Sequence, residues 1–136
     1  MMSTKLQGSC LCGNTKYAVN DSFTKAYICH CTQCKKITGS AFASNLFIEE
    51  KHLEWLTGKD KVMIYKDPNR DFTKAFCQIC GSGLPFLTSD RSRYIIPAGS
   101  LSDEPSQIET VNIFCQEIAD WEARISSAIK FKQFPE

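Results

Sequence analysis

The residues of this chain that could do chemistry are its cysteines, which number eight against two histidines. Seven of them lie in three tight clusters with the spacings C-x-C, C-x-C-x-x-C and C-x-x-C. The members, in chain order, are Cys10 and Cys12, then Cys29, Cys31 and Cys34, then Cys77 and Cys80, and Cys115 stands alone. Thiolates that are one to four residues apart can bind the same zinc ion from a single turn of chain. The spacing therefore predicts metal sites.

The clusters can be divided between ions in more than one way. The two pairs together would make a closed site of the structural kind, and the triplet would then offer three ligands and an open position, as in catalytic zinc sites. Spacing alone does not select this division over shared or bridged ions. A purely structural arrangement, in which His30 or Cys115 completes the second site, is a further alternative. The sequence lacks the cysteine runs that are typical of iron–sulfur proteins. It also lacks the βαβ pattern that surrounds a thioredoxin-like motif.

The triplet would suit thiol chemistry. Three thiolates on a divalent zinc ion leave a net charge of −1, which favours holding a substrate thiol as thiolate over activating water. Such a site fits chemistry on a thiol, and it also fits plain thiol binding. His30 could shuttle a proton or ligate the ion, although alternate side chains of extended backbone diverge. Lys35 and Lys36 could meet the carboxylates of a peptide thiol or form a solvated basic pair.

Short β-strands are the elements that must position these clusters. Apolar, β-prone runs separated by turn signals such as Asp67-Pro68-Asn69 predict a mostly antiparallel β domain. The runs cover residues 16–19, 26–29, 41–48, 62–65, 74–77, 84–87, 94–97 and 111–115. In the last run, alternation places Cys115 on one face with Val111 and Ile113, so we expect a buried Cys115.

Helical structure is expected in two places. A short turn should follow Cys31, because C-x-x-C knuckles often run into one. Near the C-terminus Asp120 can cap a helix, in which Trp121, Ile125 and Ile129, together with Ala128, recur on one face. We expect that face to pack on a sheet.

The length and the net charge of the chain limit the classes of function that it can have. A chain of 136 residues predicts one domain over 1–136. The formal net charge of +1 gives little drive toward nucleic acid. No run approaches the roughly 18 apolar residues of a membrane helix, and the N-terminus has no secretory pattern. We therefore expect a cytoplasmic protein with reduced thiols. If a signal peptide had been removed from the chain, the eight cysteines would instead be interpreted as disulfides.

The clusters and their flanking residues resemble a known family. The segments that carry the resemblance are Gly8-Ser9-Cys10-Leu11-Cys12-Gly13, Cys29-His30-Cys31-Thr32-Gln33-Cys34 and Phe76-Cys77-Gln78-Ile79-Cys80-Gly81. Their order and spacing are similar to those of the glutathione-dependent formaldehyde-activating enzyme family, also called the centromere protein V/GFA domain. The resemblance extends from about residue 8 to residue 135.

This resemblance implies a mainly β, Mss4-like fold of antiparallel sheets stapled by zinc, here with a short C-terminal helix. It implies two Zn²⁺ ions per chain. One would be structural and held by Cys10, Cys12, Cys77 and Cys80; the other would be catalytic and held by Cys29, Cys31 and Cys34. The implied activity is that of a carbon–sulfur lyase, which joins glutathione and formaldehyde reversibly to S-(hydroxymethyl)glutathione. The alternative is a non-catalytic zinc module that binds a thiol or a protein partner.

Overall fold

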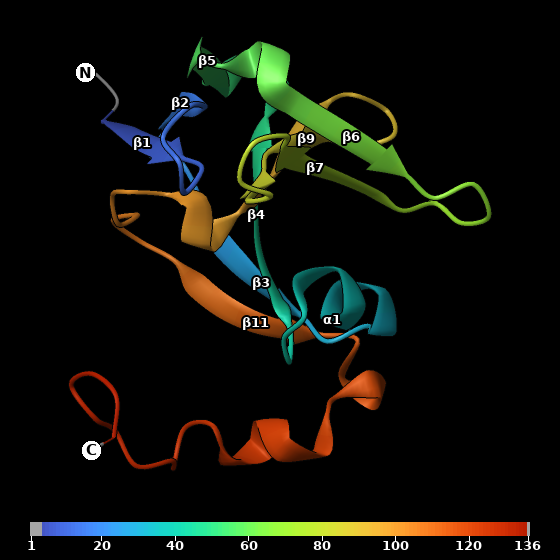
Figure 1. Ribbon diagram of the computed structural model, residues 1–136, viewed down its shortest axis with the longest axis vertical. Helices are drawn as coiled ribbons and strands as arrows, with labels where there is room; N and C mark the ends of the chain where they lie inside the picture. Colours follow the sequence, from blue (N-terminus) through green and yellow to red (C-terminus); the bar gives the residue numbers. More distant parts are fainter. Residues whose placement is uncertain (1–3, 136) are drawn as a thin grey trace.

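Strands dominate the structure, as the apolar alternation predicts. The computed structural model describes residues 4–135, in which eleven strands form three sheets and a single α-helix lies beside the central strands (Figure 1). The mainly β prediction is confirmed. No helix in this part of the chain is long and apolar enough to cross a membrane.

The central sheet has five strands in the order β11-β3-β4-β10-β9. Their bounds are β3 (Lys25–Cys29), β4 (Ala43–Glu49), β9 (Phe86–Leu87), β10 (Arg93–Pro97) and β11 (Glu109–Ile113). All neighbours are antiparallel except β11, which runs parallel to β3 with Ile113 beside Cys29. The sheet is therefore mixed, and its parallel edge lies beside the cysteine triplet.

Two three-stranded antiparallel sheets carry the remaining strands. One has the order β1-β2-β5, with β1 (Lys5–Ser9), β2 (Lys16–Asn20) and β5 (Leu53–Thr57). The other has the order β6-β7-β8, with β6 (Val62–Lys66), β7 (Thr73–Cys77) and β8 (Gly83–Leu84). The first cysteine pair follows β1 and the last pair begins at the end of β7, so each sheet delivers one pair.

Helical segments are short. The α-helix is α1 (Thr32–Thr38), which confirms the turn expected after Cys31. The 3-10 helices are η1 (Glu50–His52), η2 (Lys59–Lys61), η3 (Ala98–Ser100), η4 (Cys115–Glu117) and η5 (Asp120–Arg124).

The buried side chains form two cores. The main core draws on all three sheets and includes Cys10 and Cys77 beside Leu46, Leu84 and Ile96. A smaller core consists of Cys29, Cys34 and Ala43, with Cys31 and Ile113 packed against it. The main core thus contains members of the two cysteine pairs, and the smaller core contains the cysteine triplet.

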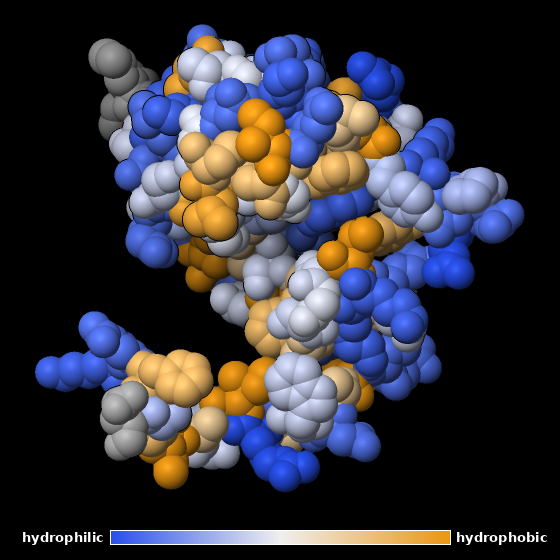
Figure 2. Space-filling model, viewed as in Figure 1, coloured by the Kyte–Doolittle hydropathy of each residue, from blue (hydrophilic) through white to orange (hydrophobic). Residues whose placement is uncertain are grey.

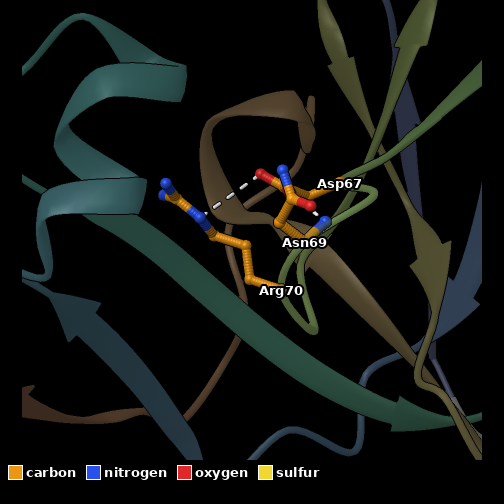
Figure 3. Close-up of polar contacts among 3 residues, drawn as sticks. All are labelled: Asp67, Asn69 and Arg70. Atoms are coloured by element: carbon orange, nitrogen blue, oxygen red, sulfur yellow. Dashed lines mark hydrogen bonds and ion pairs between the residues drawn. The ribbon is translucent and has the colours of Figure 1, made fainter.

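The turn expected at Asp67-Pro68-Asn69 connects β6 to β7. The backbone N–H of Asn69 donates to the Asp67 carboxylate at 2.8 Å, and the Arg70 guanidinium approaches the same carboxylate at 3.5 Å (Figure 3). An aspartate that bonds the backbone two residues later is a common way to close a turn.

Most expected strands are present, with differences at two places. The run 84–87 is divided between β8 and β9, which belong to different sheets, and Pro85 lies between them. Proline has no N–H for a ladder, so it interrupts the pairing there. Strands β1 and β5 were not among the expected runs, because KLQGS has a single large apolar residue and LEWLT alternates over only its first three residues.

The α-helix predicted after Asp120 is wrong. The segment is the 3-10 helix η5, its N-cap is Ala119, and no side chain caps it. Trp121, Ile125 and Ile129 are 54%, 43% and 83% exposed. A 3-10 helix repeats every three residues, so the 3.6-residue stripe does not form one face. The C-terminal segment lies apart from the sheets, and apolar side chains are visible on it (Figures 1 and 2).

The prediction of a buried Cys115 is also wrong. Strand β11 ends at Ile113, and Phe114 adopts a left-handed conformation with φ of 55°. The chain therefore leaves the sheet before the alternation reaches Cys115, and this thiol is exposed in η4.

Candidate metal centres

Two pairs of cysteines from distant parts of the sequence meet in one cluster, which we call the four-cysteine cluster. It contains the sulfurs of Cys10, Cys12, Cys77 and Cys80, which all lie within 4.8 Å of one another. The Cys10 and Cys12 sulfurs are 3.6 Å apart, and those of Cys12 and Cys77 are 3.9 Å apart.

These distances fit a tetrahedral metal ion. A zinc–sulfur bond of about 2.3 Å places two sulfurs of a tetrahedron about 3.8 Å apart, which lies between the two distances observed. A disulfide would need about 2.05 Å, and all eight cysteines are free thiols. The donor set and its spacing are therefore consistent with zinc.

Hydrogen bonds prepare this cluster for negative charge. The Ser82 hydroxyl lies 3.2 Å from the Cys80 sulfur, and this contact, with backbone N–H donors, lowers the pKa of Cys80 to about 5. The Thr15 N–H donates to the Cys10 sulfur at 3.3 Å. The Ser82 hydroxyl also accepts from the Leu11 N–H at 2.9 Å, which joins the two cysteine turns directly. Hydrogen bonds to a thiolate favour the charged form, which is the metal ligand.

The remaining clustered cysteines form a second group, the three-cysteine cluster. Cys29 is the last residue of β3, Cys31 is the N-cap of α1, and Cys34 lies in the first turn of that helix. Their sulfurs all lie within 4.8 Å of one another, and the Cys34 N–H donates to the Cys31 sulfur at 3.3 Å. Within residues 4–135, neither a histidine nitrogen nor a carboxylate oxygen joins this group.

The three-cysteine cluster is electrostatically unfavourable without a cation. Burial raises the pKa of Cys29 and that of Cys34, and the neighbouring thiolates raise the pKa of Cys34 further. A divalent cation would offset the repulsion among the thiolates, and metal binding would release their protons. The donor set therefore fits a soft divalent ion such as zinc.

Helix α1 is held in place by a residue that sequence reasoning missed. The Glu117 carboxylate accepts hydrogen bonds from the N–H and the hydroxyl of Thr32, at 2.9 and 2.8 Å. These bonds lower the pKa of Glu117. In return the Lys35 ammonium donates to the Glu117 carbonyl. An acid that caps a helix from 85 residues away leaves no local signal in the sequence.

His30 ties the cysteine triplet to the neighbouring strand. Its ring is fully buried, and the Nε2 atom lies 3.0 Å from the Asn112 amide oxygen. The backbone N–H of His30 donates to the Ile113 carbonyl at 3.1 Å. The ring packs edge-on against Phe42, and Nδ1 has no hydrogen-bond partner within residues 4–135. Neither nitrogen belongs to the sulfur group. The geometry indicates a positioning role for His30, and Asn112 is a second residue that sequence reasoning missed.

Comparison with known proteins supplies the family. The family model described as glutathione-dependent formaldehyde-activating enzyme matches residues 5–117. The chain belongs to this family. The matched part contains both cysteine clusters and ends at Glu117, so the C-terminal segment that leaves the sheets lies outside it.

A comparison with solved structures bears on the fold. The crystal structure of a protein from Rhodobacter sphaeroides superposes with a TM-score of 0.58 at 20% sequence identity, covering 78% of this chain and 100% of that chain. This likeness supports the fold. A search of curated proteins gives no match.

Proposed function

We propose that this member of the glutathione-dependent formaldehyde-activating family is a zinc-dependent carbon–sulfur lyase. It would join a small thiol such as glutathione to an aldehyde such as formaldehyde, and would also catalyse the reverse reaction. The observation that carries the proposal is the difference between the clusters. One gathers four sulfurs, whereas the other gathers three and no further side-chain donor within the described residues 4–135.

The proposal assigns two zinc ions per chain. Cys10, Cys12, Cys77 and Cys80 would hold a structural ion, and Cys29, Cys31 and Cys34 would hold the catalytic one. An ion held by the three-cysteine cluster would leave a coordination position for a thiol, and coordination to the metal would lower the pKa of that thiol.

The residues of the chain contribute rigidity and orientation. The N-terminal end of α1 is fixed by the bonds from Thr32 to Glu117 and by the contact of the Cys34 N–H with the Cys31 sulfur. His30, bonded to Asn112, fixes the backbone between two cysteines. Groups whose own positions are fixed hold reactants at short distance, and proximity can supply much of the rate gain.

The reaction itself needs little further machinery. The deprotonated thiol sulfur forms a bond to the carbonyl carbon of the aldehyde, and the carbonyl oxygen takes up the proton that the thiol lost. In the reverse direction the hydroxyl loses this proton, the carbon–sulfur bond breaks, and thiol and aldehyde are released. Atoms and charge balance without an oxidant or reductant.

The proposal also covers the cellular compartment and the domain organisation of the protein. All eight cysteines are free thiols, which supports a reducing compartment, and we propose the cytoplasm. We also propose that residues 1–136 act as one domain, without nucleic acid or membrane as a partner.

The test is exchange between free and adduct forms of glutathione. Purified, zinc-loaded protein is mixed with glutathione and formaldehyde, and the exchange rate is followed by NMR. We expect acceleration over buffer that is lost in Cys29→Ser and retained in Cys115→Ser, because Cys115 is an exposed thiol outside both clusters. No acceleration by the wild-type protein would refute the lyase and favour the non-catalytic binding module.

A further inference from the structure

A cavity of about 630 Å³ adjoins the four-cysteine cluster and the end of helix α1. Cys10 of the four-cysteine cluster contributes to one wall, and Ile37 and Thr38 at the end of α1 contribute to another. The helix connects this wall to the three-cysteine cluster, because the Thr38 hydroxyl donates to the carbonyl of Cys34 at 2.7 Å. Lys74, from β7, also lines the cavity. A molecule in this cavity would therefore lie beside the same short helix that carries Cys34.

Lys74 gives the cavity its charge. It is the only charged side chain among the lining residues in the described part of the chain, and no acidic residue lines the wall there. Within residues 4–135 its ammonium forms no ion pair; the ion pairs join Lys51 to Glu49 and Arg70 to Asp67. The cavity therefore presents an unpaired positive charge.

Burial makes that charge expensive. Lys74 is half-buried, which lowers its pKa, while the negative charge of the Cys34 thiolate acts in the opposite direction. Burial outweighs the effect of Cys34, and direct pairing of the partly desolvated ammonium with an anion would remove much of the remaining cost. An anionic group in the cavity would supply this pairing.

The position of the ammonium depends on a glycine. A Cβ atom at Gly83 would lie only 2.8 Å from the Nζ atom of Lys74. The absence of a side chain on β8 thus leaves the space that the lysine occupies. Among the serines in the same wall, Ser82 and Ser100 already direct their hydroxyls to the Cys80 sulfur and the Pro97 carbonyl, whereas Ser102 would offer a donor for a second oxygen of the anion.

We propose that this cavity binds a carboxylate of the thiol substrate, with Lys74 as its ligand, and thereby selects thiols that carry a carboxylate over neutral thiols. The proposal rests on the proposed function, because it assumes that the substrate sulfur reaches the three-cysteine cluster. It adds a specificity-determining residue: Lys74, which would hold the carboxylate of the thiol.

The test measures binding without turnover. Zinc-loaded protein is titrated calorimetrically with S-methylglutathione, which has no thiol proton, and with its dimethyl ester, which has no carboxylate. We expect the acid to bind at least about tenfold more tightly than the ester, as for a hydrogen bond to a charged group. Lys74→Met should remove this preference, and Lys74→Arg should retain much of it.

Lys66→Met is the matched control, because Lys66 is an exposed lysine on the adjacent strand β6. It should leave both affinities unchanged.

If Lys74→Met does not fold, Gly83→Ala should weaken acid binding, since its methyl group displaces the ammonium. Equal binding of acid and ester, no binding of either, or equal losses in Lys74→Met and Lys66→Met would overturn the proposal. A protein that binds the acid selectively but accelerates no exchange would refute the lyase alone, and one that accelerates exchange but prefers neither ligand would refute this proposal alone.

Discussion

The structural role of the four-cysteine cluster can be separated from simple packing by replacing its two less buried members. Cys12 is exposed and Cys80 is half-buried, whereas Cys10 and Cys77 are 2% and 0% exposed and belong to the main core. The double variant Cys12→Ser/Cys80→Ser leaves that core intact but leaves only two sulfurs for the ion. We therefore expect it to lose the zinc that joins the turn after β1 to the end of β7.

The size of the loss follows from the zinc binding that the variant gives up. Cys12 and Cys77 are 65 positions apart in the sequence, and their sulfurs lie 3.9 Å apart, so the unfolded chain has no preformed site for the ion. An ion that binds only the folded chain stabilises it by about 4 kcal/mol when free zinc is about a thousandfold above its dissociation constant. A domain of this size has a free energy of unfolding of about 5–15 kcal/mol. The variant should therefore fold, with much lower stability.

Urea denaturation in the presence and absence of a chelator provides the assay. With zinc, the free energy of unfolding of the double variant should be about 4 kcal/mol below that of the wild type. With chelator, both proteins lack the ion and the difference should shrink to about 0.5 kcal/mol. Cys115→Ser, the control, should match the wild type in both conditions. A difference that persists in chelator would refute the reasoning, because it would come from packing and not from the metal.

Two further predictions concern the supports of the site. Glu117→Gln weakens the hydrogen bonds that hold Thr32. Those bonds lower the pKa of Glu117, so the carboxylate contributes its full stabilisation of the fold above the unfolded pKa of about 4.3. This stabilisation is lost as the pH falls through the folded pKa. The Tm difference from wild type should thus vanish at low pH, and a pH-independent difference would contradict this. Gly58→Ala should cost roughly 2–5 kcal/mol in urea denaturation, because φ is +72° and a Cβ would lie 2.2 Å from the Asn14 carbonyl oxygen. Gly99→Ala, which meets nothing within 4 Å, should cost far less, and equal losses would exclude the steric explanation.

The sequence predicts the local part of this structure well. Alternation locates strands such as β2, β3 and β10 to within a residue or two, because each carries its own buried face. Cysteine spacing identifies the clusters, because ligands from one turn must be close in sequence. Spacing left open which pairs combine, and this is settled only by the sheets that bring Cys12 and Cys77 together.

What the sequence does not predict depends on contacts between distant segments. Glu117 meets Thr32 across 85 residues, and His30 meets Asn112 across 82. Lys74 is an ordinary strand lysine until α1 and β8 enclose it. The apolar stripe beginning at Trp121 is the opposite case, because a helical period is present but no sheet packs against it.

The most direct test of the account is the number and coordination of metal ions in zinc-loaded crystals, measured by anomalous diffraction at the zinc edge. The account predicts two zinc ions per chain. One should have four sulfur ligands from Cys10, Cys12, Cys77 and Cys80, and the other should have three sulfur ligands and one ligand from outside the protein. A single ion, or a fourth protein ligand such as His30 at the three-cysteine cluster, would contradict the open site on which the proposed chemistry depends.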